Sequence, residues 1–328
     1  MTPFVIEASE VQSMLASQAG LSMEDLLSDL VGAAKRLARP PISRFYVGAV
    51  GLGISGRIFL GVNLEFEGLP LNNTVHAEQF LVTNAAQHGE QALQIIAVSA
   101  APCGHCRQFL QELRGAPDLR ILIVDAAAET RTLAHFLPHR FGPNDVLSGD
   151  FPLLLEPRQN GLSLKVTHSV DNLTIASQNM SHYLHGRETS ALDAALEDAK
   201  SSINCTAIYA KDNELVCNLT ARLKAAAFEA ANKSHAPYTN SPSGVALLTK
   251  SRQIFCGSYM ESVAYNPSLP PLQSALVAFV ARDGGSYDDI VQTVLVEREG
   301  APIQFMDTAK LLLQKISQDC KIHVYYTS

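Results

Sequence analysis

The chain has 328 residues, of which 47% are hydrophobic and 17% charged, and its formal net charge is −7. This composition excludes disordered and collagen-like chains, and six cysteines in this length exclude a disulfide-dense secreted domain. The acidic balance disfavours nucleic acid as the main partner, because proteins that bind phosphates usually carry a basic face. The N-terminus has no basic region followed by an apolar run, and no stretch reaches about 18 uncharged apolar residues. We therefore expect a cytoplasmic protein without a membrane segment.

Hydrophobic periodicity in the first half predicts the order helix, strand, strand, helix, strand, helix, strand. The helices are expected over residues 22–38, 75–87 and 106–114. The strands are expected over residues 45–52 and 57–66, which form a hairpin around GISG, and over 93–99 and 119–125. Strands that alternate with helices imply a sheet covered on both faces.

Residues 156–186 hold no sustained period and are rich in Asn, Ser, Gln and His, which indicates a connecting arm. The periodic pattern then resumes. Helices are expected over residues 219–233, 272–281 and 308–318, and strands over 244–250, 253–260, 290–296 and 322–326. At about 100–200 residues per domain, the length fits two domains.

The two halves look like weak copies of each other. When GRIFLGVNLEF is set beside RQIFCGSYMES, Gly61 meets Gly257 and Glu65 meets Glu261. The triplet HAE of the first half then faces LQSA of the second, which puts Gln273 and Ala275 near the positions of a ligand and an acid. We therefore expect a first half with chemistry and a second half that is scaffold.

The strongest chemical signal is HAE at residues 76–78, followed by PCGHC at residues 102–106. The pattern H-x-E…P-C-x-x-C is the signature of the zinc deaminases. One imidazole and two thiolates, from His76, Cys103 and Cys106, leave the fourth tetrahedral position of Zn²⁺ free for water, as in a catalytic site. Glu78 is close enough in sequence to reach that water without being a ligand, so it is expected to act as general base and general acid.

Each part of this motif has a simpler interpretation when taken alone. A CxxC pair occurs in redox and structural zinc sites about as often as in catalytic ones, and a His-x-Glu triplet occurs by chance. The interval of 103 − 76 = 27 residues, with a strand inside it, is more restrictive and favours the deaminase site. His105 lies inside the CxxC and is a candidate fourth ligand, but helical rotation turns it away from Cys103 and Cys106, so we expect it on the helix surface.

Over nearly its whole length the chain resembles cytidine deaminase, in the two-domain homodimeric form found in some bacteria and in plants. The segments that carry the resemblance are HAEQFLVTNA and SAAPCGHCRQFLQELR. It implies an α/β fold, a three-layer α/β/α sandwich with a mixed central sheet, present twice and catalytically empty in the second copy. We expect an N-terminal arm over 1–21, a catalytic zinc-dependent deaminase domain over 22–155, a linker over 156–185 and a degenerate deaminase-like domain over 186–328.

The resemblance also assigns the zinc ligands to His76, Cys103 and Cys106 and the proton shuttle to Glu78. It implies further nucleoside contacts: Asn63 and Glu65 at the ribose 3′-hydroxyl, Phe45 on the pyrimidine, the Ala77 N–H at the ring carbonyl, the Ala101 carbonyl at the exocyclic amine, and Phe141 over the neighbouring subunit's active site. Asn63 and Glu65 have a simpler interpretation as polar residues that end a strand, and Phe45 as a core residue. Two residues that are two apart on a strand project the same way, so Asn63 and Glu65 can jointly bind one hydroxyl.

The function expected from these features is hydrolytic deamination of cytidine and deoxycytidine to uridine and deoxyuridine, with release of ammonia. The enzyme would be a cytosolic homodimer in pyrimidine salvage, a hydrolase of a cyclic amidine C–N bond with one Zn²⁺ per catalytic domain. Free nucleosides are favoured, because Glu65 would repel a 3′-phosphate and the chain lacks a basic aromatic stripe. The alternatives are the same zinc chemistry on polynucleotide or nucleotide cytosine, and a non-catalytic zinc-binding scaffold, which fits the second half alone.

Overall fold

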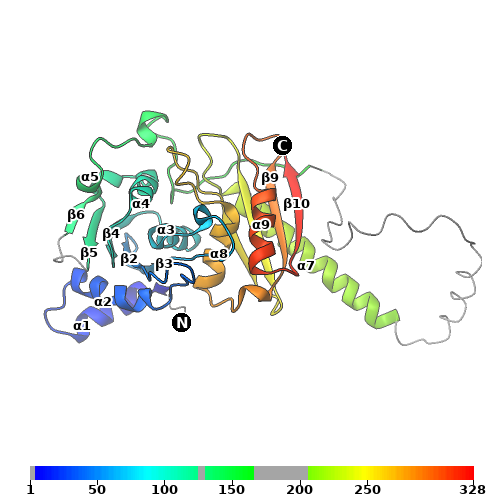
Figure 1. Cartoon of the computed structure of the whole chain (residues 1–328), viewed down its shortest axis with the longest axis horizontal. Coiled ribbons are helices and arrows are strands. Elements are labelled where there is room, and N and C mark those ends of the chain that lie inside the picture. The colour runs from blue at the N-terminus through cyan, green and yellow to red at the C-terminus, as the bar shows by residue number, and fades with distance from the viewer. Residues whose placement is uncertain (1–3, 125–129, 166–205) are drawn as a thin grey trace, which may run out of the picture.

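The computed structural model describes residues 4–124, 130–165 and 206–328, with the backbone alone over 206–218. Its first half contains a six-stranded sheet in the order β1-β3-β2-β4-β5-β6 (Figure 1). The strands are β1 Val5–Ile6, β2 Gly48–Gly53, β3 Ile58–Val62, β4 Leu93–Val98, β5 Arg120–Ile123 and β6 Thr130–Thr132. Only β4 and β5 pair in parallel, so the sheet is mixed.

The helices of the first half are α1 Ala8–Ser17, α2 Met23–Lys35, α3 Ala77–Gln87, α4 Gly104–Phe109 and α5 Leu133–Phe136. Three of them, α2, α3 and α4, follow the predicted order, whereas α1 and α5, like strands β1 and β6, were not predicted. Ser22 caps α2 through reciprocal hydrogen bonds with Asp25, which explains why that helix starts there. The helix predicted over 106–114 instead begins at Gly104, because Cys103 is its N-cap, and its last turn tightens into a 3₁₀ turn over Leu110–Glu112.

The second half holds a four-stranded sheet in the order β10-β9-β7-β8. Its strands are β7 Ser243–Thr249, β8 Ile254–Ser258, β9 Ile290–Arg298 and β10 Lys321–Thr327, and its helices are α7 Thr206–Asn232, α8 Pro271–Ala281 and α9 Met306–Ile316. Strands β9 and β10 pair in parallel around α9, whereas β7 pairs antiparallel with β8 and β9. The second sheet is therefore mixed as well.

Four glycines show how helices cover both faces of each sheet. A Cβ on Gly48 of β2 would lie 2.7 Å from the Val31 carbonyl oxygen of α2, and a Cβ on Gly61 of β3 would lie 2.2 Å from the Ala77 carbonyl oxygen of α3. Gly61 lies opposite Ala49, the neighbour of Gly48, so these two helices lie on opposite faces. In the second half, a Cβ on Gly244 would lie 2.2 Å from the Ala231 nitrogen of α7, and a Cβ on Gly257 would lie 2.0 Å from the Ala275 nitrogen of α8, so these helices cover opposite faces of the second sheet. Each half is therefore a three-layer α/β/α sandwich, and the fold is duplicated, as predicted.

The strand registers confirm the pairing of Gly61 with Gly257 and of Glu65 with Glu261, but they correct the alignment of the next helix. An isolated bridge joins Leu64 to Val75 in the first half (75 − 64 = 11 residues), and the matching bridge joins Met260 to Leu269 in the second (269 − 260 = 9 residues). The loop of the second half is two residues shorter. The expected placement of Gln273 and Ala275 is therefore wrong, and Pro270 and Leu272 occupy the positions of His76 and Glu78.

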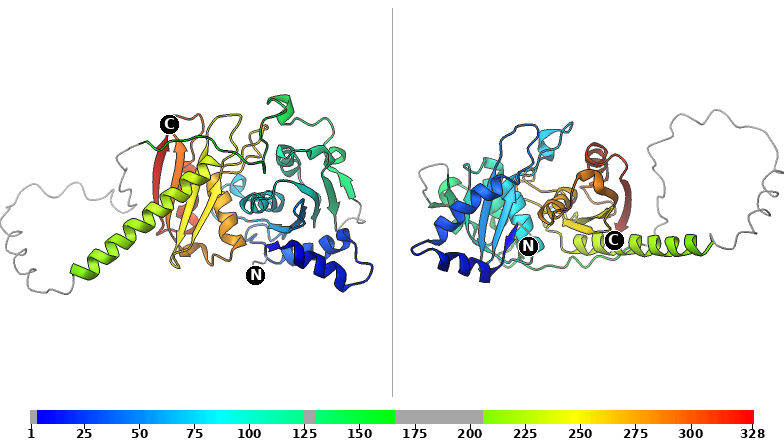
Figure 2. Two further views of the ribbon diagram at one scale, coloured as in Figure 1. Left: turned by 180° about the vertical axis from the view of Figure 1, so that it is seen from behind. Right: turned by 90° about the horizontal axis from the view of Figure 1, so that it is seen from below.

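Helices α3 and α8 pack against each other between the two sheets, and apolar residues of both halves form one core (Figures 1 and 2). The expected N-terminal arm supplies β1 and α1, and residues 156–165 run along the second half, where the Asn160 amide donates to the Ala231 carbonyl. Residues 166–185 of the predicted linker lie outside the described residues. Among the helices that the structure describes, none combines the length and the apolar character needed to cross a membrane.

Candidate active site

The side chains of His76, Cys103 and Cys106 meet at the beginnings of α3 and α4. The two sulfurs lie 3.7 Å apart, and the His76 Nδ1 atom lies 3.5 Å from the Cys103 Sγ atom and 3.3 Å from the Cys106 Sγ atom. A tetrahedral Zn²⁺ with bonds of about 2.3 Å to sulfur and about 2.0 Å to nitrogen needs about 3.8 Å between its sulfurs and about 3.5 Å between sulfur and nitrogen. The three side chains therefore fit a single tetrahedral zinc ion, and they form the one such group of His, Cys, Asp and Glu found in the described part of the chain.

Local structure explains why these three residues converge. His76 and Cys103 are the N-caps of α3 and α4, and Cys106 is one turn into α4, so both thiols are on one side of that short helix. A hydrogen bond with Cys106, and a second with His76, lower the pKa of the Cys103 thiol to about 3. The hydrogen bond with Cys103, together with burial, raises the pKa of the Cys106 thiol, so the geometry favours the metal-binding thiolate form at Cys103, while Cys106 keeps its proton until a metal displaces it.

Glu78 lies in the first turn of α3 beside the thiols, and only 4% of its surface is exposed. The Cys106 thiol donates to its carboxylate across 3.2 Å. Burial raises the pKa of the Glu78 carboxyl. A carboxyl next to a metal-ligand set, but not part of it, can pass protons to a bound molecule.

His105 lies next to the metal-ligand group without joining it. Its ring stacks on the His76 ring, with centroids 5.2 Å apart and an interplanar angle of 23°. The expectation that it is not a fourth ligand agrees with this position. His105 therefore contacts the ring of a predicted zinc ligand, which a residue on the open helix surface would not do.

Asn63 and Glu65, at the end of β3, hold the loop between α2 and β2. The Glu65 carboxylate accepts hydrogen bonds from the backbone N–H groups of Ile42 (3.0 Å) and Ser43 (2.8 Å) and from the Ser43 hydroxyl. The Asn63 amide accepts from the Val47 N–H and donates to the Phe45 carbonyl, each across 2.9 Å. The two side chains point the same way, as predicted, and both keep unused hydrogen-bonding capacity.

The other residues predicted to contact substrate surround the same end of the first sheet. Phe45 is 61% exposed, so the core interpretation of this ring is wrong. Ala77 is the first residue of α3, where a backbone N–H has no partner within the helix, and Ala101 is exposed two residues before Cys103. Phe141 is 47% exposed, and its carbonyl accepts from the Gln108 amide of α4 across 2.7 Å.

Gln79 is a buried residue of α3 that the sequence analysis did not single out. Its Oε1 atom accepts from the His76 N–H across 3.2 Å, and its Nε2 atom donates across 2.9 Å to the Pro267 carbonyl of the second half. It thereby fixes the start of α3 against the second half. A Gln three residues after an N-cap is a known helix-start pattern, and this signal could have identified it.

The matching place in the second half is filled by apolar and aromatic side chains. Pro270 and Leu272 replace His76 and Glu78. Tyr259 replaces Asn63, and its ring packs against the Phe305 ring in a tilted arrangement, with centroids 4.7 Å apart. Leu272, Tyr259 and Phe305 are all buried. Within the described residues, this place therefore lacks a group of His, Cys, Asp and Glu side chains that could hold a metal ion.

Comparison with known proteins gives concordant results. The family described as "Cytidine and deoxycytidylate deaminase zinc-binding region" matches residues 22–121 through one profile and residues 133–310 through a second. Cytidine deaminase 1 of Arabidopsis thaliana is 45% identical, over 98% of this chain and 97% of that protein, and a cytidine deaminase of Vibrio vulnificus is 34% identical, over 94% and 85%. A crystal structure of cytidine deaminase from Mycobacterium tuberculosis is 32% identical over 37% of this chain and 99% of that one, with a TM-score of 0.34.

Proposed function

The chain belongs to the cytidine and deoxycytidylate deaminase family, and we propose that His76, Cys103 and Cys106 hold its zinc ion while Glu78 moves the protons. The protein is a zinc-dependent cytidine deaminase, which converts cytidine and deoxycytidine to uridine and deoxyuridine with release of ammonia. The observation that carries the residue assignment is the tetrahedral spacing of one nitrogen and two sulfurs with a buried carboxylate beside them.

A zinc ion held by these residues supplies a Lewis acid that brings the pKa of a bound water to about 7. The Glu78 carboxylate takes a proton from the attacking water and gives it to N3 of the pyrimidine while the hydroxyl adds to C4. It then moves the hydroxyl proton to the C4 amino group, the C–N bond breaks, and ammonia leaves. One water is consumed and one ammonia released, so a single carboxylate serves as base and then as acid.

The remaining contacts select a free nucleoside. Asn63 and Glu65 each keep a free lone pair or N–H at the end of β3, where they can bind the ribose 3′-hydroxyl together. The Ala77 N–H would donate to the ring carbonyl of the pyrimidine, and the Ala101 carbonyl would accept from its exocyclic amine. The exposed Phe45 ring would cover the face of the base. A carboxylate at the 3′-hydroxyl repels a 3′-phosphate, which disfavours RNA and single-stranded DNA.

The test compares wild type with Glu78→Gln. We expect one zinc ion per chain in both proteins and ammonia release slowed by at least about 100-fold in the variant, because the proton carrier is lost while the ligands remain. Near-normal turnover of Glu78→Gln, or active wild type without stoichiometric metal, would contradict the assignment. Faster turnover of a cytosine-containing oligonucleotide than of cytidine would favour the polynucleotide alternative.

The protein is further proposed to work as a homodimer in the cytosol, in pyrimidine salvage. Exposed apolar side chains gather on the loops that carry the predicted substrate contacts, namely Ile42, Phe45, Tyr46, Leu71 and Phe141. Such a group is typical of a surface that a second subunit covers, and Phe141 would then reach that subunit's active site. Cys103 and Cys106 are free thiols, as a reducing compartment allows. Light scattering in solution would measure a mass of two chains, and a single-chain mass would refute the dimer.

A further inference from the structure

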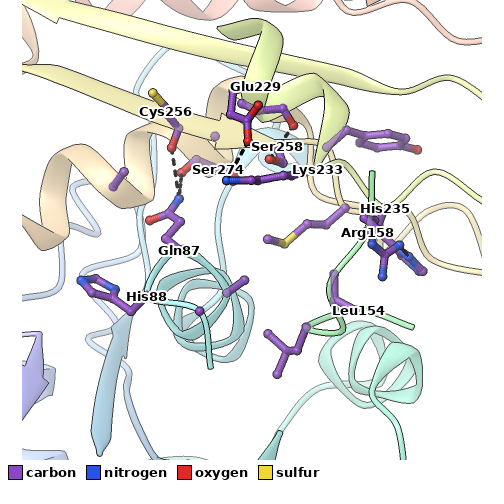
Figure 3. A pocket seen from close by; sticks show the side chains of 18 of the residues that line it. Gln87, His88, Leu154, Arg158, Glu229, Lys233, His235, Cys256, Ser258 and Ser274 are labelled. Atoms are coloured by element: carbon purple, nitrogen blue, oxygen red, sulfur yellow. Dashed lines mark hydrogen bonds and ion pairs between the residues drawn. The ribbon is translucent and has the colours of Figure 1, made fainter. Parts of the chain in front are cut away.

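A cavity of about 980 Å³ lies between the two halves of the molecule (Figure 3). Its walls come from α7, from α8 and from the C-terminal end of α3, and its floor includes strand β8. Strand β8 is the last strand of the second sheet, and within the described residues it pairs only with β7. The cavity therefore runs beside an unpaired strand edge.

The same edge of the first sheet is covered by the chain itself. Strand β1 pairs antiparallel with β3 through the partners Val5–Phe59 and Ile6–Ile58, and the Leu60 N–H donates to the Phe4 carbonyl across 2.9 Å. This strand lies between α2 and α3. The cavity lies in the matching position between α7 and α8, so it is the space that a covering strand would fill in the second half.

The hydrogen-bonding groups of the two edges also match. Leu60 lies opposite Val50 of β2, and Cys256 lies opposite Ala246 of β7 in the same register, so the Cys256 N–H points to the outer edge. The Cys256 carbonyl accepts from the Gln87 side-chain amide across 3.3 Å, as the Leu60 carbonyl accepts from an amide of α3 across 3.0 Å. The outward N–H of Cys256 is therefore the donor available to an added strand.

The side chains that α8 turns toward the cavity are smaller than those at the matching positions of α3, and this difference leaves room for a large side chain. In the first half, Phe4 of the covering strand stacks on Phe80 of α3 with ring centroids 5.1 Å apart. Ser274 of α8 stands at the position of Phe80, and its buried hydroxyl has no hydrogen-bond partner among the described residues (Figure 3). Ala278, one turn further along, also lines the cavity. An apolar side chain can occupy this space.

The charge on the cavity wall favours an acidic partner. The carboxylate of Glu229 is paired with Lys233 across 3.0 Å, so these two charges balance. Arg282 lies over the Phe255 ring, and its Nε atom donates to the Ala278 carbonyl, so its guanidinium is held at the wall without a neutralising carboxylate in the described part of the chain. Arg158, half-buried beside His235, already has the carboxylates of Glu156 and Glu112 nearby, so Arg282 is the guanidinium of this wall that an acidic side chain can pair with.

We propose that this cavity is a docking site for an extended peptide segment that adds to β8 as an antiparallel strand. A backbone carbonyl of the peptide accepts from the Cys256 N–H, a bulky apolar side chain fills the space over Ser274, and an acidic side chain lies toward Arg282. This mode of recognition takes its affinity from main-chain hydrogen bonds and its specificity from the pockets on either side. Unpaired strand edges readily accept such a strand.

The probe for this proposal is a fluorescein-labelled peptide with the sequence of residues 2–7, TPFVIE, which holds a Phe and a Glu and includes the strand that covers the equivalent edge of the first sheet. Fluorescence anisotropy with the full-length protein is expected to show saturable binding. Cys256→Pro removes the outward N–H at a position where an edge strand tolerates proline, and it should weaken binding at least about tenfold. Cys256→Ala keeps the N–H and is the matched control, with unchanged affinity and unchanged deaminase activity.

A second variant makes the test independent of how well the proline is tolerated. Ser274→Phe puts back the ring that α3 carries at Phe80 and should abolish binding while deaminase activity remains. The exchange of the Cys256 amide hydrogen should slow when peptide is added to wild type. The proposal is overturned if the wild-type protein shows no saturable binding of the peptide, even if a different segment of the chain is then found to cover the β8 edge. Equal affinities of Cys256→Pro and Cys256→Ala would also overturn it, because the peptide would then bind elsewhere, for example by displacing β1.

Discussion

Glu65 and Glu261 share three equivalent hydrogen bonds in the two halves, although only the first half carries the zinc motif. Each carboxylate accepts from two successive backbone N–H groups and from the hydroxyl of the second of those residues, and in the second half these groups belong to Tyr238 and Thr239. Glu261 also accepts from the Tyr259 hydroxyl across 3.3 Å. Glu65 therefore has a structural task besides the one proposed at the ribose. We expect Glu65→Ala and Glu261→Ala each to lower the free energy of unfolding by about 1–3 kcal/mol. Only Glu65→Ala should also raise the KM for cytidine, which denaturation and steady-state assays would check; equal effects on KM would contradict a role in binding.

Asn63 differs from Glu65 because the second half keeps no equivalent amide and has Tyr259 there. Its hydrogen bonds to the Val47 N–H and the Phe45 carbonyl position the loop that carries the exposed ring. Asn63→Ala should therefore raise the KM for cytidine about tenfold, as expected for one lost hydrogen bond, and leave the zinc content at one ion per chain. Metal analysis beside the kinetics separates the two roles. Loss of zinc in this variant would show that Asn63 supports the metal group instead.

At the level of elements, the close approach of helix to strand depends on glycine. A Cβ on Gly61 would lie 2.2 Å from the Ala77 carbonyl oxygen, and a Cβ on Gly257 would lie 2.0 Å from the Ala275 nitrogen, so each alanine must displace the first turn of a helix. We expect Gly61→Ala and Gly257→Ala each to destabilise the protein by about 1–3 kcal/mol, as overpacking does. Gly61→Ala moves the turn that carries His76 and Glu78, so it should also reduce zinc content and turnover. A variant Gly61→Ala with normal zinc affinity would mean that α3 adjusts without moving its N-terminus.

The helices and strands with a strong local pattern were predictable from the sequence. Hydrophobic periodicity identified α2, and the HAE and PCGHC motifs identified the metal group, because spacing along a helix fixes which side chains share a face. The start of α4 was missed by two residues because a cysteine N-cap gives no usual capping signal. The second-half alignment failed because a loop two residues shorter leaves no trace in periodicity. Contacts such as that of Gln79 with Pro267 join distant segments, and local patterns carry no information about them.

At the level of the whole molecule, the second half holds both helices that carry the metal group. Gln79 donates a hydrogen bond from α3 to the Pro267 carbonyl. Glu112, in the turn after α4, is completely buried against the second half. The Glu112 carboxylate accepts from the Val263 N–H and the Tyr238 hydroxyl, each across 2.7 Å, and is bonded to His235 Nε2 across 3.2 Å. The degenerate half is therefore part of the support for the zinc group, which explains why it can lose its own ligands and keep its fold.

Glu112 also predicts a pH dependence of stability that arises between the halves. Burial raises the pKa of its carboxyl to about 7, against about 4.3 in an unfolded chain. Between these values the native state keeps a proton that the unfolded state has lost. The contribution of Glu112 to the free energy of unfolding is therefore full below about pH 4.3 and is lost as the pH rises through about 7, by about 4 kcal/mol in total. Buried His235, whose pKa is lowered by desolvation, gives a slope of opposite sign in every variant that keeps it.

The measurement compares urea unfolding of wild type and Glu112→Gln at pH 5 and pH 8. Wild type should lose more stability than Glu112→Gln between these two pH values, because the amide mimics the protonated carboxyl and cannot release a proton. Glu67→Gln, which alters an exposed carboxylate of the first half, is the matched control and should keep the wild-type slope. Equal slopes for wild type and Glu112→Gln would mean that the hydrogen bonds from Val263 and Tyr238 keep the carboxylate ionised in the interface throughout this range.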